Sequence, residues 1–141
     1  MTSSIRNFVT FRVGSQWYGV DVENVIEISH LVLLNDVPTA SADVVGLMTL
    51  RNVVMPVIDL RLRFGLTEPE FRLDTPIIAV KTHDQSMGII VDDIDNVEQV
   101  SADQISAQLG NAFPYVYGTA QQHNRLLMLL DLDSLTLATV R

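Results

Sequence analysis

The side chains most often used in catalysis and metal binding are thinly spread along this sequence. None of its three histidines has a second histidine or a cysteine at metal-ligand spacing: His30, His83 and His123. The densest acidic group, Asp92, Asp93 and Asp95, does not fit a calcium loop, because Val97 falls where a liganding side chain is needed. The chain also lacks a Gly-x-Ser-x-Gly elbow and a glycine-rich phosphate loop. We therefore expect no enzyme activity, no metal and no cofactor.

The basic residues form one cluster in the sequence: Arg51, Arg61 and Arg63. The chain as a whole has 17 acidic and 9 basic residues and a net charge of −8, which repels phosphate backbones and anionic lipid. Asp59 lies two residues before Arg61, so a local ion pair or helix cap explains these charges better than catalysis does. We expect no nucleic-acid binding.

Length and composition suit a cytoplasmic protein with one domain over residues 1–141. The hydrophobic fraction of 48% is too high for a disordered chain, and no apolar run is long enough to span a bilayer. The first residues lack the basic and apolar regions of a secretory signal, and the chain has no cysteine. We expect no direct membrane insertion, and residues 1–6 are expected to be flexible.

Any site must be positioned by β-strands, because the sequence consists mainly of short segments in which apolar, often β-branched, residues alternate with polar ones. Strands are expected over 8–13, 17–22, 53–58, 77–82, 87–91, 116–119 and 126–130. Pro56 cannot donate a ladder hydrogen bond, so its strand should lie at a sheet edge or carry a bulge there. Helical turns are expected near 22–28 and 42–47. A C-terminal helix is expected to begin with Asp133 or Ser134 as its N-cap.

The predicted N-terminal hairpin and the predicted central hairpin resemble each other when their sequences are aligned at an offset of 69 residues. Gly19 then meets Gly88, and the residues on either side keep their character: Phe8 meets Ile77, and Gln16 meets Gln85. Any two amphipathic hairpins share some alternation, so coincidence remains an alternative. We favour an internal duplication, which predicts two similar small barrels joined by a crossing loop near 65–75.

The most distinctive segment runs from Gly46 to Gly65. It predicts a strand, a tight turn at Arg51-Asn52, a second strand and a short helical turn. Asn52 suits a turn position with positive φ, because its short amide can bond the local backbone. Such a turn would hold the Arg51 guanidinium toward solvent.

This segment resembles the signature of CheW-type chemotaxis coupling proteins, which reads Gly-x-x-Asn-Leu-Arg-Gly-x-x-x-Pro-Val-Ile/Val-Asp-Leu-Arg-x-x-Phe/Leu-Gly. The matching residues are Gly46, Leu50, Arg51, Pro56, Val57, Ile58, Asp59, Leu60, Arg61, Phe64 and Gly65. The resemblance extends over almost the whole chain, through the first hairpin, the second hairpin and the closing strands. It departs from the family pattern at Thr49, where asparagine is usual, and at Asn52, where glycine is usual.

The resemblance implies an all-β fold with minor α content: two small five-stranded SH3-like barrels around a shared core, with a short C-terminal helix. It further implies a non-catalytic adaptor that couples the cytoplasmic tips of chemoreceptors to the regulatory domain of a CheA-type histidine kinase. Such a protein would lie in the cytoplasm at membrane-associated receptor arrays. By resemblance, the positions that contact receptor or kinase are Arg51, Asn52, Val54, Val25, Glu27, Ile28 and Gly88.

Two other readings stay open. Thr49 and Asn52 are compatible with a divergent CheW-like scaffold that serves a different complex, such as pilus-type signalling or polar localisation. A small enzyme or ligand-binding barrel would need a deep pocket with convergent polar groups. For Val25 and Ile28 plain core packing is an equal alternative, and Gly88 could simply complete a strand bend.

Overall fold

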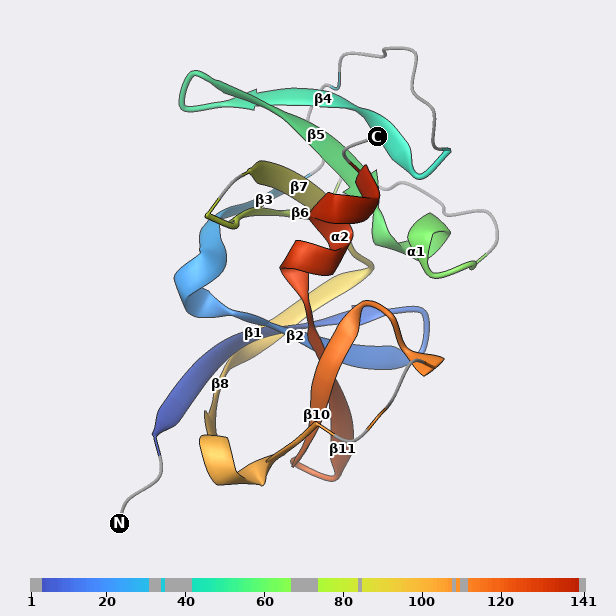
Figure 1. The fold of residues 1–141 in the computed structure, drawn as a ribbon. Coiled ribbons are helices and arrows are strands. Elements are labelled where there is room, and N and C mark those ends of the chain that lie inside the picture. Colours follow the sequence, from blue (N-terminus) through green and yellow to red (C-terminus); the bar gives the residue numbers. More distant parts are fainter. Residues whose placement is uncertain are drawn as a thin grey trace.

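Two β-sheets stacked end to end make up the protein (Figure 1). The computed structural model describes residues 4–30, 34, 42–66, 74–83, 85–107, 109 and 112–139, with only the backbone described for 136–139. Sheet A has the strand order β8 (Asp93–Ser101), β1 (Ile5–Val13), β2 (Gln16–Asp21), β11 (Arg125–Leu130), β10 (Val116–Gln122), β9 (Ile105–Ser106). Sheet B has the order β3 (Val25–His30), β6 (Pro76–Lys81), β7 (Ser86–Ile90), β5 (Val53–Asp59), β4 (Val44–Leu50).

Short helical segments connect or flank these strands. They are the 3-10 turns η1 (Val22–Asn24) and η2 (Ala102–Gln104), and the α-helices α1 (Leu60–Arg63) and α2 (Leu132–Thr139). Helix α2 lies across the junction between the two sheets (Figure 1). None of the described helices has the length and apolar composition that crossing a bilayer requires.

The expected all-β fold with two modules is confirmed, but the strand count is corrected. Sheet A has six strands because the two-residue strand β9 pairs with β10 at its edge. In neither sheet do the first and last strands of the order pair with each other, so the two modules are curled sheets and not closed barrels.

The first hairpin of each half of the chain pairs with the later strands of the other half. The hairpins β1–β2 and β6–β7 are the two copies seen in the sequence, and each is antiparallel. Strand β3 follows β2 along the chain but pairs with β6, whereas β8 follows β7 but pairs with β1. Strands β11 and β5 then add in parallel to β2 and β7. Each sheet is therefore built from both halves of the sequence.

Among the residues that the structure describes, three apolar clusters fill the space that this arrangement encloses. The largest lies between the sheets and includes Phe11, Ile58 and Ile89, together with Leu132 and Leu135 of α2. The other two lie within the curl of sheet B and of sheet A, as their members come from one sheet each. The expected shared core is thus the largest of the three clusters.

Several local expectations are corrected. Residues 44–47 form the start of β4 and not a helical turn, in keeping with the β-branched side chains of Val44 and Val45. Strand β5 lies inside sheet B, yet its parallel pairing with β7 begins only at Val57, so Pro56 need not donate there. The partner strand β4 carries a bulge between Val44 and Gly46.

The ends of the chain also differ from expectation. The Asp131 carboxylate accepts hydrogen bonds from the Ser134 backbone N–H (3.4 Å) and hydroxyl (2.9 Å), so Asp131 caps α2 in place of Asp133 or Ser134. Ile5 and Arg6 begin β1, while residues 1–3 lie outside the described residues, and the flexibility expected of 1–6 stays a prediction. Much of the crossing loop, residues 67–73, also lies outside the described residues.

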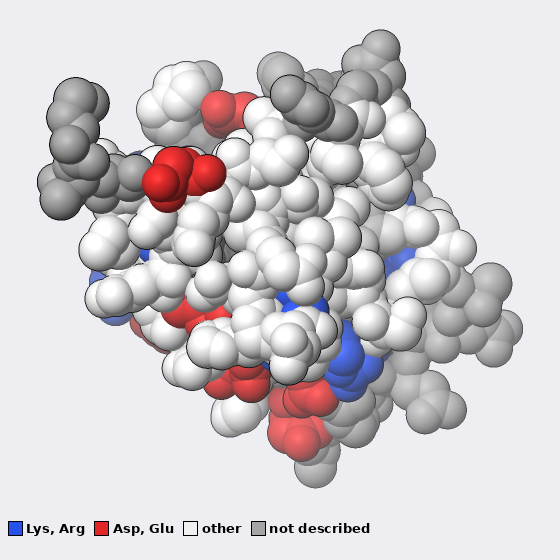
Figure 2. Space-filling view, turned by 90° about the horizontal axis from the view of Figure 1, so that it is seen from below, with Lys and Arg blue, Asp and Glu red and all other residues white. Residues whose placement is uncertain are grey.

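Two of the three clustered arginines are buried in ion pairs, so they form no basic surface. Arg61 bonds Asp59 through Nε (3.1 Å) and Nη2 (3.2 Å), and Asp92 through Nη1 (3.2 Å). The Arg63 guanidinium pairs with Asp43 and stacks near the Tyr115 ring. Seen from the end that carries sheet A, acidic side chains lie in a few separate groups, basic side chains lie beside some of them, and much of the face is uncharged (Figure 2).

Candidate protein-docking site

A two-residue turn at the tip of the β4–β5 hairpin carries the first two predicted site residues. Arg51 and Asn52 both have positive φ, 51° and 65°, and the residues on either side of them, Leu50 and Val53, are the last pair of the β4–β5 ladder. This pair of φ values is that of a type I′ turn, whose twist matches a tight hairpin. Both side chains are exposed, as the sequence predicted for Arg51.

The Arg51 guanidinium pairs with Glu27 of β3. Its Nη2 lies 3.2 Å from Glu27 Oε1, and both side chains are substantially exposed. An exposed pair of this kind contributes about 0–1 kcal/mol to stability, so it positions the side chain more than it holds the fold. β3 and β4 are the two edge strands of sheet B. The ion pair between Glu27 on β3 and Arg51 beside β4 therefore shows that the sheet curls until its edges approach each other.

Apolar side chains are exposed beside this pair. Val54 is 62% exposed and Val53 is 46% exposed at the start of β5, and Ile28 is 45% exposed on β3. The register places Thr49 directly opposite Val54, so this departure from the family pattern lies next to a predicted contact residue. The structure thus brings Arg51, Glu27 and exposed valines together at one end of sheet B.

The remaining two predicted residues face inward. Val25 is half-buried against the core between the sheets. Gly88 is buried in β7, where an added Cβ would lie 2.8 Å from Met48 Cε and 3.2 Å from Ile77 Cγ2. The lack of a side chain at Gly88 therefore serves packing inside sheet B, and no surface is exposed there for a partner to contact directly.

Comparison with known proteins identifies the family. The model of the CheW-like domain matches residues 7–139. The chain is 33% identical to the chemotaxis protein CheW of Bacillus subtilis, over 95% of this chain and 90% of that protein. It is 28% identical to the chemotaxis protein CheW of Helicobacter pylori, over 93% and 81% of the two chains. The crystal structure of the scaffolding protein TtCheW from Thermoanaerobacter tengcongensis superposes with a TM-score of 0.82 at 26% identity, covering 92% of this chain and 89% of that one.

The chain belongs to the CheW-like domain family. It is accordingly a non-catalytic adaptor of chemotaxis signalling, as the sequence predicted. Across the described ranges no three histidine, aspartate or glutamate side chains converge in a way that could hold a metal ion.

The sequence reasoning missed a second hairpin tip in this CheW-like chain that matches the first. His123 and Asn124, at the β10–β11 turn, have φ values of 49° and 63°, close to those of Arg51 and Asn52. His123 Nε2 lies 3.7 Å from Glu98 Oε1 on β8, just as Arg51 lies beside Glu27 on β3. In both halves the tip residue therefore contacts an acid on the strand that follows the first hairpin of that half.

An offset of 72 residues would have revealed this second repeat. Gly46 then meets Gly118, and each lies at a bulge of its strand. The Asp59 N–H donates to the Asp43 carbonyl at 2.8 Å, and the Asp131 N–H donates to the Tyr115 carbonyl at the same distance. The offset of 69 found in the first hairpins hides this match because the two halves differ by three residues in between.

Proposed function

We propose that this CheW-like chain couples the cytoplasmic tips of chemoreceptors to the regulatory domain of a CheA-type histidine kinase, in the cytoplasm at membrane-associated receptor arrays. The observation that carries the proposal is the exposed group at the β4–β5 tip: Arg51 held by Glu27, beside Val54. The mechanism is geometric. The adaptor fixes receptor and kinase relative to each other and transmits a signal through contacts that differ between two states.

The tip has the composition expected of a protein-binding centre. Arg51 presents five N–H donors, of which the Glu27 contact uses one, so the others can bond a carboxylate or the carbonyls at a helix end. Val54 and Ile28 supply apolar area that a partner would remove from water. Glu27 keeps the guanidinium oriented before the partner arrives, which lowers the entropy lost on binding.

The test is binding of a soluble receptor-tip fragment and of a kinase regulatory domain to Arg51 variants. Arg51→Ala should weaken receptor binding about tenfold, and Arg51→Glu should abolish it, because the new carboxylate lies beside Glu27 and reverses the charge offered. Circular dichroism and melting temperature should stay at their wild-type values, since the ion pair is exposed.

Arg12→Ala is the matched control. Arg12 is another partly exposed arginine in an ion pair, bonded to Asp93 at 2.8 Å, but it lies on sheet A. Wild-type receptor affinity of Arg51→Glu, or equal losses in the Arg12 and Arg51 variants, would remove Arg51 from the docking site.

The second candidate is a divergent CheW-like scaffold for another complex, such as pilus-type signalling or polar localisation. It is favoured by Thr49 and Asn52, because both departures from the family pattern are exposed at the same tip as Arg51. Co-purification separates the two: recovery of a kinase regulatory domain together with a chemoreceptor supports the coupling role, and recovery of neither supports the divergent scaffold.

A further inference from the structure

An aromatic cavity of about 490 Å³ opens beside the core that the two sheets share. Its wall comes from strand β2, the end of helix α1, the segment that leads into β10, and strand β11. Four of the nine aromatic residues of the chain line it: Tyr18, Phe64, Phe113 and Tyr115. None of its described lining residues belongs to the β4–β5 tip, so the cavity is separate from the proposed docking site.

The aromatic rings of the wall form a row that starts in the core. The Tyr18 ring is stacked between Phe11 and Phe64, with ring centroids 5.9 Å and 5.1 Å apart. Phe64 in turn contacts Tyr115 at 5.9 Å. Tyr18, Phe64 and Tyr115 are only partly buried, and Phe113 is 45% exposed. The row therefore leaves aromatic surface on which a further planar ring can stack.

Two neutral polar side chains and a paired arginine complete the wall. Within the described part of the chain the Tyr18 hydroxyl makes no hydrogen bond, and burial raises the pKa of Tyr18, so the phenol stays neutral and can donate. Gln16 Nε2 donates to two backbone carbonyls at 3.0 Å and 2.9 Å, which holds the amide and leaves its oxygen as an acceptor. The charge of Arg63 is balanced by Asp43.

We propose that this cavity binds a small, uncharged, planar aromatic molecule that carries a hydrogen-bonding group, such as a phenol or an indole. The volume lies within the range of about 300–1,000 Å³ typical of small-molecule sites, whose walls are mainly apolar and aromatic with a few polar groups. The ring of the ligand stacks on the aromatic row, and its polar group bonds the Tyr18 hydroxyl or the Gln16 oxygen. The proposal does not depend on the proposed function.

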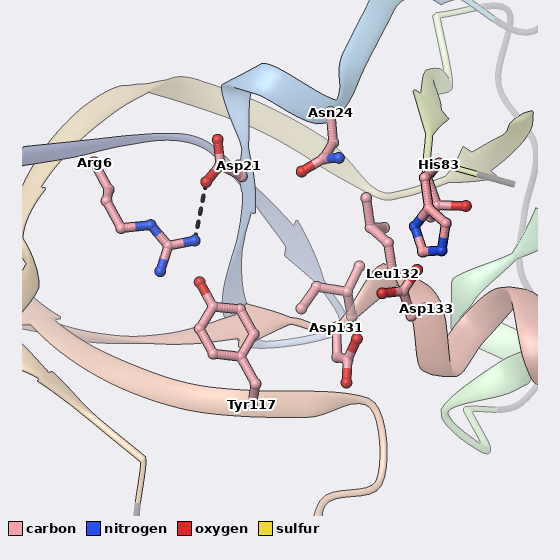
Figure 3. A pocket seen from close by; sticks show the side chains of 10 residues that line it. Arg6, Asp21, Asn24, His83, Tyr117, Asp131, Leu132 and Asp133 are labelled. Carbon is pink, nitrogen blue, oxygen red and sulfur yellow. Dashed lines mark hydrogen bonds and ion pairs between the residues drawn. The ribbon is translucent and has the colours of Figure 1, made fainter. Parts of the chain in front are cut away.

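A second cavity, at the junction of the two sheets, is of a different kind (Figure 3). It has a volume of about 190 Å³ and shares no lining residue with the aromatic cavity. Charged side chains dominate its wall, and Arg6 bonds Asp21 there at 2.9 Å (Figure 3). The aromatic cavity offers a charged ligand no unbalanced countercharge, because Arg63 is its one charged lining residue among those described and is paired. The remaining competitor is an aromatic side chain of a protein partner.

Three probes test the ligand class on the full-length chain labelled with ¹⁵N. At pH 7, 2-naphthol, naphthalene and decahydro-2-naphthol are titrated, and backbone amide shifts are followed by NMR. We expect saturable shifts with 2-naphthol, centred on Tyr18, Phe64 and Tyr115. Decahydro-2-naphthol has the same carbon skeleton and hydroxyl but no aromatic face, so it should bind at least about threefold more weakly.

Variants of the wall locate the site. Tyr18→Phe should weaken 2-naphthol binding by about threefold to tenfold, the effect of one hydrogen bond, and leave naphthalene binding unchanged. Phe113→Ser should weaken binding of both aromatic probes at least about threefold. Val97→Ser is the matched control, because Val97 is an exposed apolar residue on β8 that does not line the cavity, and it should bind as wild type.

Four outcomes would overturn the proposal. They are shifts that never saturate, equal affinity for 2-naphthol and its decahydro form, equal losses in the Phe113 and Val97 variants, and full 2-naphthol affinity in both Tyr18→Phe and Phe113→Ser. A receptor-tip fragment or a kinase regulatory domain is added in a separate titration. If either one shifts the amides around the cavity while 2-naphthol shifts none, the cavity is a protein contact and the proposed small-molecule site is wrong.

Discussion

Replacing Arg61 with methionine should destabilise the protein by about 3–5 kcal/mol, the usual cost of removing one partner from a buried ion pair. Arg61 is 5% exposed and Asp59 is fully buried, so the substitution leaves a carboxylate without its countercharge in the core. The loss of the Arg61 ion pairs should destabilise both sheets. Asp92, the second partner of Arg61, also accepts from the Gly14 N–H at 2.7 Å, and Gly14 belongs to the turn between β1 and β2 of sheet A.

Urea unfolding at pH 7 measures this effect. With an m-value of about 2 kcal/mol/M, the midpoint should fall by about 1.5–2.5 M. Arg12→Met removes a partly exposed ion pair and should cost less than about 1 kcal/mol. Adding Asp59→Asn to Arg61→Met removes the uncompensated charge and should recover part of the lost stability. A loss below about 1 kcal/mol for Arg61→Met, or no recovery in the double variant, would refute the role of Arg61 as the countercharge of Asp59.

Two further outcomes follow from packing and burial. Gly88→Ala should cost about 1–2 kcal/mol, because its Cβ would lie 2.8 Å from Met48 Cε and 3.2 Å from Ile77 Cγ2. Gly19→Ala, whose nearest contacts are at 3.3 Å, should cost less, and the melting temperatures of the two variants decide this. Burial raises the pKa of Tyr18, so the folded state favours the neutral phenol. Stability should then fall as pH rises above about 10, and Tyr18→Phe should show a smaller fall in a pH series of urea midpoints.

The hairpins, their resemblance to each other and the family signature could be predicted from the sequence, because each depends on local alternation and spacing. The first repeat was visible at Gly19 and Gly88, and the structure makes β1–β2 and β6–β7 equivalent hairpins. Asn52 was expected at positive φ, and it has a φ of 65°. The Asp59–Arg61 contact was expected as a local pair or cap, and it is both.

The sequence could not reveal which sheet each third strand joins. Strands β3 and β8 each follow a 3-10 or extended connection that would allow pairing with either hairpin, and the choice depends on packing between distant segments. The strand status of Val44 and Val45 was missed although β4 pairs with its neighbour in sequence, β5, and although β-branched residues favour strands. The sequence also could not predict the polar cavity at the junction of the two sheets, because the residues that line it are spread from Arg6 to Asp133.

The pairing of each first hairpin with strands of the other half makes the two modules depend on each other for their folding. Without β8, strand β1 would lose the pairing that runs from Ile5 to Arg12, and without β3, strand β6 would be an open edge. The core between the sheets draws on both, and α2 packs into it through Leu132 and Leu135. Neither half can therefore bury its apolar face alone, and β3, which carries Glu27, pairs with β6, whose Ile78 and Val80 belong to the core shared with sheet A. An adaptor built this way keeps the surfaces of its two sheets at a fixed separation without a rigid linker.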